Sequence, residues 1–167
     1  MAEIGRLNSL EILHHTPQGF YLDGAEHGEI LLPSRYVTDS MKEGNMITVF
    51  VYRDSEDRLI ASTDRPKAIV GEFAGLKVTS VHPNVGAFLD WGLPKDLLLP
   101  YREQTKPARK DQIIVVRIIL DPKSERLVAS ARLNRWLEKQ APRYRRGQSV
   151  RLLISERTPM GLNALIN

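Results

Sequence analysis

The chain has 167 residues, of which 42% are apolar and 26% charged, so it has the composition of a globular protein with enough apolar residues to bury a core. It contains no cysteine, which excludes disulfides, thiolate nucleophiles and cysteine-ligated zinc. The longest apolar stretch, residues 113–120, is interrupted by an arginine and is too short to span a bilayer, and no signal-peptide pattern opens the sequence. We therefore expect a soluble, cytoplasmic protein with no membrane partner.

The net charge of +4 conceals an uneven distribution. Residues 1–66 carry six Lys and Arg against eleven Asp and Glu, whereas residues 67–135 carry twelve against seven and residues 136–167 six against two. An acidic first third followed by a basic remainder indicates a polyanionic partner for the basic part. On charge alone, a solvated surface with uneven charge is the alternative.

Short alternating segments fill the first part of the chain. Ile47, Val49 and Val51 alternate with the residues between them, which is the period of a half-buried strand. The polar run 54–57 predicts a hairpin loop, and the longer polar segment 32–44 has room for a short helical turn. About five short strands in roughly 65 residues favour a small closed barrel over a sandwich, because closure removes exposed edges.

The same pattern then occurs a second time. The segment GFYLD at residues 19–23 matches GAFLD at residues 86–90, which lies 67 positions later. The segment RLIAS at residues 58–62 matches RLVAS at residues 126–130, with one added residue that falls in the hairpin before it. Such a repeat predicts two copies of one β-barrel in tandem.

We divide the chain accordingly into a first module over residues 1–65 and a second over residues 66–132. Apolar residues spaced for one helical face predict a basic linker helix over residues 133–146. Residues 147–167 look like the first two strands of a third copy, either in a fragment of a longer protein or as a remnant that packs elsewhere. An isolated hairpin is marginal in water and has unpaired edges, so we expect this segment to be poorly ordered or to self-associate with a second chain.

The order of strand, turn, GAFLD, LLLPYRE and finally RLVAS resembles an S1 RNA-binding domain, a subtype of the OB-fold. The tandem order, with a proline after the third strand of both copies, resembles the bacterial conserved virulence factor B family, in which three S1 domains precede a winged-helix domain. The resemblance implies an all-β fold of tandem S1-type OB-fold barrels, each five-stranded, with short connecting helices and the start of a third module. It also implies that single-stranded RNA binds on one barrel face.

In S1 domains the RNA contacts come from aromatic residues, a His after the third strand and an Asp/Arg pair of the final hairpin. By resemblance, Phe88 takes the place of the stacking Phe, and Tyr21 takes it in the first module. The Asp/Arg pair is matched by Asp121 with Arg126 and by Asp54 with Arg58. Both modules depart from the S1 pattern at two positions. The position of the His holds Pro33 and Pro100, and the position just before the strand glycine, where an aromatic residue is expected, holds Gln18 and Val85.

A single-strand binder needs cations for phosphates and exposed rings for bases, with stacking worth about 1–3 kcal/mol per base. The second module combines both, and its further candidate RNA-binding residues are Lys77, Trp91, Tyr101 and Arg102. Trp91 ends its strand beside a glycine, which favours an exposed ring. The densest basic cluster of the chain follows this module. Three of its side chains are candidates to contact the phosphate backbone of RNA, namely Arg143, Arg145 and Arg146. Core packing is the alternative for each ring, and solvation is the alternative for each charge.

Nothing in the sequence predicts catalysis. The pair His14–His15 has no Asp or Glu at the spacing of a metal site, and neither a nucleophile elbow nor a Gly-rich phosphate loop is present. We expect a non-enzyme without cofactor or metal, and two functions stay open. The first is a single-stranded RNA-binding regulator that acts post-transcriptionally on gene expression through the second module, the acidic first module being a spacer or docking module. The second is an interaction module that docks onto a ribosome or transcription component and has only residual RNA affinity.

Overall fold

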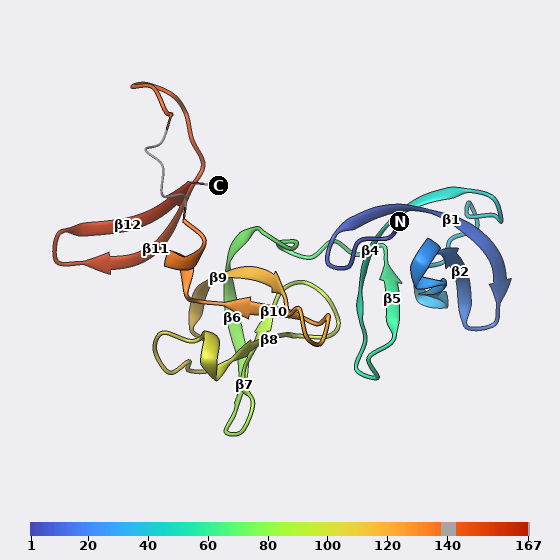
Figure 1. Cartoon of the computed structure of the whole chain (residues 1–167), viewed down its shortest axis with the longest axis horizontal. Helices are drawn as coiled ribbons and strands as arrows, with labels where there is room; N and C mark the ends of the chain where they lie inside the picture. Colours follow the sequence, from blue (N-terminus) through green and yellow to red (C-terminus); the bar gives the residue numbers. More distant parts are fainter. Residues whose placement is uncertain (138–142, 167) are drawn as a thin grey trace. The chain divides into compact units, whose positions relative to one another are not determined.

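The computed structural model describes residues 1–137 and 143–166. In this part of the chain, twelve strands form two closed barrels of five strands each and a final two-stranded sheet (Figure 1). The helical elements found there are short 3-10 turns, and none of them is long and apolar enough to cross a membrane. The predicted all-β architecture of two OB-like barrels is confirmed.

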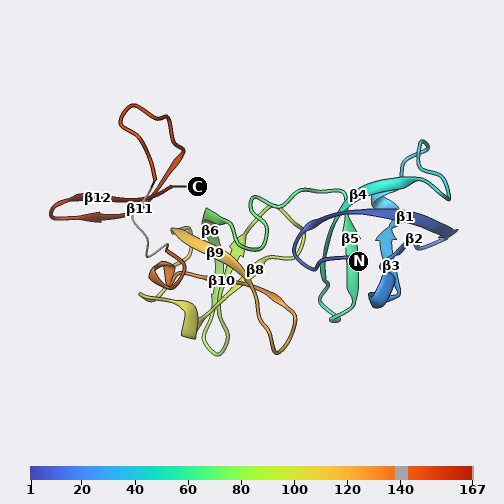
Figure 2. The ribbon, with the colours of Figure 1, turned by 45° about the horizontal axis from the view of Figure 1, so that its top comes forward.

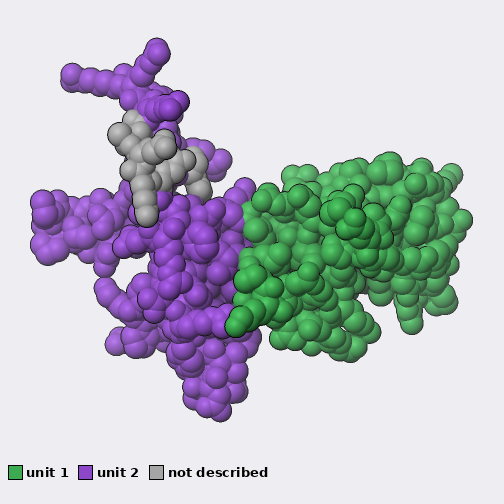
Figure 3. Space-filling model, in the orientation of Figure 1, with its two compact units in different colours: residues 1–70, 92–95, 120–127 green, residues 71–91, 96–119, 128–167 purple. Residues whose placement is uncertain are grey.

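The chain divides into two compact units that are not continuous in sequence (Figure 3). Unit 1 combines residues 1–70 with two short later segments, 92–95 and 120–127. Unit 2 contains the rest of the chain. Two loops that belong to the second repeat in sequence are thus grouped with the first repeat in space.

The first barrel consists of β1 (Leu7–Thr16), β2 (Gly19–Asp23), β3 (Glu29–Pro33), β4 (Met46–Arg53) and β5 (Leu59–Ser62). The strand order is β1-β2-β3-β5-β4, in which β3 and β5 run parallel. Two 3-10 turns, η1 (Ala25–His27) and η2 (Ser34–Tyr36), flank β3, and η2 occupies the polar segment where a helical turn was predicted. The core is filled by inward-facing apolar residues of the five strands, among them Ile12, Leu22, Ile30, Leu32, Val49 and Val51.

The second barrel repeats this arrangement with β6 (Phe73–His82), β7 (Gly86–Asp90), β8 (Leu97–Pro100), β9 (Ile113–Leu120) and β10 (Leu127–Ser130). Its strand order, β10-β8-β7-β6-β9, is that of the first barrel read in the opposite direction around the closed sheet. The 3-10 turn η3 (Tyr101–Glu103) follows β8 as η2 follows β3. The repeat in the sequence is therefore a repeat in structure.

The second strand of each barrel begins at a glycine that the packing requires. Gly19 and Gly86 have φ angles of +143° and +137°, which side chains rarely adopt. A Cβ at Gly19 would lie 2.0 Å from the Leu32 carbonyl oxygen, and one at Gly86 would lie 2.4 Å from the Leu99 carbonyl oxygen. The absence of a side chain thus lets the third strand approach the second.

The last two strands, β11 (Leu152–Thr158) and β12 (Gly161–Ile166), form an antiparallel hairpin (Figure 2). Leu165 is buried, and Glu156 lies 3.2 Å from Lys106 in an ion pair inside unit 2. Leu152, in contrast, is 57% exposed. The hairpin is formed within the chain, and its association with a second chain stays a prediction.

The predicted linker helix over residues 133–146 is wrong where the structure describes it. A single 3-10 turn, η4 (Leu133–Arg135), stands at its start, and residues 143–146 are not helical. Residues 138–142 of this prediction lie outside the described residues. The apolar spacing was too short a signal, because helices of about 12 residues or fewer are marginal unless packing supports them.

Side chains near η4 contact the second barrel instead of forming helical pairs. The Arg117 guanidinium carbon of β9 lies 4.8 Å from the ring centroid of Trp136 and 5.3 Å from that of Phe73. Arg132 Nε donates to the Arg102 carbonyl oxygen at 2.6 Å. These tertiary contacts fix the segment that leaves the barrel.

Candidate nucleic-acid interface

An outward-facing row of apolar side chains crosses three strands of the first barrel. Tyr21 of β2 lies opposite Leu31 of β3, and Leu31 lies opposite Ile60 of β5. All three are half-buried, whereas Phe20 and Leu22, the neighbours of Tyr21, are buried. Strand alternation therefore places the row on the outside of the barrel. We call Tyr21, Leu31 and Ile60 the first stripe.

The second barrel carries the equivalent row. Phe88 of β7 lies opposite Leu98 of β8, and Leu98 lies opposite Val128 of β10. Phe88 and Leu98 are half-buried, and Val128 is almost fully buried. We call these three residues the second stripe. The sequence repeat aligns Tyr21 with Phe88, and the structure places them at equivalent positions of equivalent strands, β2 and β7.

A groove of about 500 Å³ runs along the first stripe. Its polar lining includes Gln18, Glu29, Asp54 and Arg58. Both the stacking residue and the Asp/Arg pair that the resemblance assigned to the first module line this groove. The sequence therefore correctly predicted contributions to the groove from β2 and from the loop between β4 and β5.

The Asp54–Arg58 pair is formed at one border of the groove. Arg58 Nε and Nη2 donate to Asp54 Oδ2 at 3.0 and 2.8 Å, and the backbone N–H groups of Glu56 and Arg58 donate to Oδ1 at 2.9 and 3.0 Å. Burial raises the pKa of Asp54, but these hydrogen bonds outweigh it and hold the pKa below its ordinary value. Asp54 is therefore ionised at neutral pH, and its oxygens are fully engaged.

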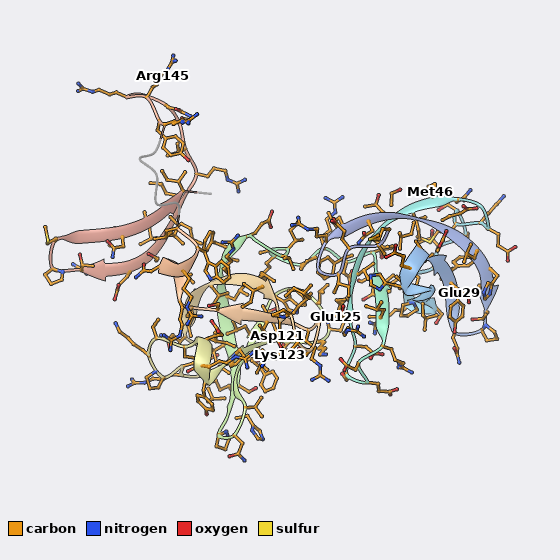
Figure 4. The ribbon with its side chains drawn as sticks, in the orientation of Figure 1. Glu29, Met46, Asp121, Lys123, Glu125 and Arg145 are labelled. Atoms are coloured by element: carbon orange, nitrogen blue, oxygen red, sulfur yellow. The ribbon has the colours of Figure 1, made fainter. Side chains whose placement is uncertain are left out.

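A second pair, which sequence reasoning missed, joins Glu29 of the groove lining to His14, a residue outside that lining. The His14 ring stacks on Tyr21 with centroids 5.0 Å apart and an interplanar angle of 20°. His14 Nε2 lies 3.1 and 3.2 Å from the two carboxylate oxygens of Glu29, which is labelled in Figure 4. The sequence signal was hidden because β1 has a register shift between Ile12 and His14, which changes the face on which the histidine lies.

The Asp/Arg pair expected in the second module is placed differently. Arg126 Nε donates to Asp57 Oδ1 at 2.8 Å, within unit 1, and not to Asp121 as the resemblance implied. Asp121 Oδ2 accepts a hydrogen bond from the Ser124 hydroxyl at 2.7 Å. Figure 4 labels Asp121 on this loop between β9 and β10. Arg126 therefore pairs with Asp57, which is distant in the sequence but close in space, and not with Asp121 of its own hairpin.

One predicted ring does not belong to a binding surface. Trp91 is 2% exposed, so the expectation of an exposed indole at the end of its strand is wrong. Burial of this large apolar ring stabilises the folded state, whereas an exposed ring would not. Tyr101, in contrast, is 45% exposed, and its hydroxyl donates to the His82 carbonyl oxygen at 2.9 Å.

The predicted cations are exposed. Lys77 Nζ lies 3.0 Å from Asp111 Oδ1, so part of its charge is compensated. Three arginines on the segment before β11, which are candidates for phosphate contacts, are also exposed: Arg143, Arg145 and Arg146. Figure 4 labels Arg145. Arg102 is exposed as well. Within the described residues, no cluster of three His, Asp or Glu side chains is arranged to hold a metal ion.

Comparison with known proteins supports the resemblance stated above. Residues 4–64 match the family model described as S1 domain. The chain is 31% identical over 114 residues to uncharacterized protein YitL of Bacillus subtilis, an alignment that covers 65% of this chain and 38% of YitL. It is 24% identical over 119 residues to conserved virulence factor B of Staphylococcus saprophyticus, with 67% of this chain and 40% of that protein covered. The similarity to S1 domains and to conserved virulence factor B is confirmed.

A solved structure from Streptococcus pneumoniae, described as a multidomain protein with nucleic acid binding domains, has the same fold. It superposes with a TM-score of 0.69 over 98% of this chain and 59% of its own length, at 17% sequence identity. The chain spans about two fifths of the length of the curated relatives it matches, 38% and 40%.

Proposed function

We propose that this chain, whose first barrel matches the S1 domain, binds single-stranded RNA through its two stripes and contributes to post-transcriptional control of gene expression in the cytoplasm. The observation that carries the proposal is the repeated register, in which an aromatic residue followed by two aliphatic residues crosses the same three strands of both barrels. A barrel core needs only its inward-facing residues. Rings kept half-exposed at equivalent outward positions suit base stacking, which tolerates any base sequence.

The two modules differ in the charges around their stripes. Residues 67–135 carry a net charge of +5, and their exposed cations suit phosphates, whereas residues 1–66 carry a net charge of −5. In the first barrel the Arg58 charge is already compensated by Asp54 and Glu56. We therefore assign most of the phosphate contacts to the second module and the basic segment after it. We propose binding without catalysis, since the assigned residues serve stacking and ion pairing.

Neutralising the basic segment is expected to weaken RNA binding independently of sequence. Changing the three exposed arginines Arg143, Arg145 and Arg146 together to glutamine removes up to three phosphate contacts. Because each phosphate neutralised on a single strand contributes about −0.7 to the slope of log K against log salt, the slope should flatten by about 2. Base preference should not change, because phosphate contacts position a strand without reading it. Fluorescence titrations with unstructured RNA at several salt concentrations measure both quantities.

The matched control removes the same net charge from another surface, by changing to glutamine the exposed residues Arg6, Arg35 and Arg65. This triple variant should keep the slope of the unmodified protein. An unaltered slope in the first variant would mean that the segment is solvated and makes no RNA contact.

A second candidate function is supported by the acidic first module. Its net charge of −5 is unfavourable for phosphates, so its groove is also suited to docking on a protein component of the ribosome or of the transcription machinery. In that case RNA affinity would be weak and would not depend on Phe88. RNA titrations of the unmodified chain and of a Phe88→Ala variant therefore distinguish the two functions.

A further inference from the structure

We infer that the groove along the first stripe selects guanine over other bases, with Tyr21 as the stacking platform and the Glu29 carboxylate as the group that reads the base edge. The inference rests on the proposed function, because it concerns how one of the two proposed RNA-binding faces discriminates bases. It follows from the different states of the two carboxylates that border the groove.

The Tyr21 ring is prepared to receive a single base. His14 stacks on it at a centroid distance of 5.0 Å and so covers one face of the ring. The ring also lines the groove, and His14 is not among the groove's lining residues, so the ring face turned to the groove is not the one that His14 covers. A ring already held by a neighbour loses little side-chain entropy when a base stacks on it.

The two carboxylates differ in their remaining capacity to accept hydrogen bonds. An ionised carboxylate has about four lone-pair sites. Asp54 accepts four hydrogen bonds, two from the Arg58 side chain and two from backbone N–H groups. Glu29 has His14 Nε2 beside its two oxygens, and its side chain is 53% exposed. Glu29 is therefore the carboxylate with acceptor sites left for a ligand.

The position of Glu29 places these acceptors beside the stacking platform. Glu29 lies two residues before Leu31 on β3, and Leu31 lies opposite Tyr21. Strand alternation puts Glu29 on the same outward face as Leu31. Tyr21 and Glu29 both line the groove, so a base that stacks on Tyr21 there lies within reach of the Glu29 side chain once its carboxylate turns away from His14.

The charge of Glu29 decides which part of RNA it receives. The Glu29 carboxylate repels a phosphate, and the charge of Arg58, which also lines the groove, is already compensated by Asp54 and Glu56. The Glu29 carboxylate attracts base edges that carry N–H donors. Guanine presents two adjacent donors, N1–H and the N2 amino group, which match the two oxygens of one carboxylate. Adenine and cytosine present one amino group, and uracil presents a single N3–H.

The experiment uses the full chain and eight-nucleotide RNAs made of uridines with one central guanosine, inosine, adenosine, cytidine or uridine. Amide chemical shifts of the first stripe, followed by NMR, give the dissociation constant at that face separately from the second barrel. We expect the guanosine oligomer to bind about tenfold more tightly than the all-uridine one, as a bidentate contact allows. The inosine oligomer, which lacks the N2 amino group, should fall between them.

The variant Glu29→Gln should reduce the guanosine preference to about twofold or less, because an amide offers one acceptor without charge. The matched control Glu26→Gln changes an exposed carboxylate on η1 and should keep the preference. Equal affinity for guanosine and uridine oligomers, equal affinity for guanosine and inosine oligomers, or a preference unchanged in Glu29→Gln would each overturn the inference while RNA binding stands. If no oligomer shifts the amides of either stripe, the proposed function itself fails and the inference fails with it.

Discussion

Replacing Phe88 with alanine is expected to weaken the binding of unstructured RNA by about five- to 150-fold, the equivalent of the 1–3 kcal/mol that stacking on one aromatic ring contributes. Phe88 lies in the centre of the second strand of its barrel, half-exposed and in register with Leu98. The second module also holds more cations than the first, so a base stacked there is joined by phosphate contacts. Fluorescence anisotropy with a labelled uridine oligomer measures the loss.

Two variants show whether the loss comes from stacking. Phe88→Leu keeps most of the apolar volume but removes the ring, so it should lose most of the affinity while the barrel stays folded by circular dichroism. Tyr21→Ala should lose less than Phe88→Ala, because phosphates are not attracted to the acidic first module. A loss in Tyr21→Ala that equals or exceeds that in Phe88→Ala would show that charge does not divide the work between the modules.

Replacing Gly86 with alanine is expected to lower the free energy of unfolding of the second barrel by about 2–5 kcal/mol. The new Cβ would combine an unfavourable φ of +137° with a position 2.4 Å from the Leu99 carbonyl oxygen. Since that oxygen belongs to the backbone of a barrel strand, it moves only if the sheet moves. Denaturation in urea, followed by circular dichroism, gives the change in midpoint.

The chain contains its own control for this effect. Gly161 begins β12 as Gly86 begins β7, and it has the same φ of +137°, but no atom lies within 4 Å of an added Cβ. Gly161→Ala therefore strains the backbone without a clash, and the barrel midpoints should be unchanged. If Gly86→Ala unfolds at the same urea concentration as the unmodified chain, the close approach of the third strand does not limit stability.

The barrels were predictable because their signals are local and occur twice. Alternating segments fix the face of each strand, the Asp-rich turns fix the hairpins, and an offset of 67 residues aligns Tyr21 with Phe88. Each of these signals depends on neighbours in the sequence. The 3-10 turns after the third strands follow from the same local reasoning.

The features that sequence reasoning missed depend on contacts between distant residues. Trp91 was expected to be exposed because a glycine follows it, but a buried position was available to its ring. Arg126 was expected to pair with Asp121 of its own hairpin, but Asp57, 69 residues away, takes its place. His14 and Glu29 meet across β2, and a register shift in β1 conceals the geometry. A single sequence carries no direct record of such pairs.

The contact of Arg117 with Trp136 has a practical consequence for observing this protein. The chain has two tryptophans, of which Trp91 is 2% exposed and Trp136 is 38% exposed beside a guanidinium group. The emission of an indole depends on its surroundings, so the buried ring reports on the integrity of the second barrel. The ring on Arg117 reports on the segment that leads to the basic cluster. Intrinsic fluorescence thus separates displacement of that segment from unfolding without any attached label.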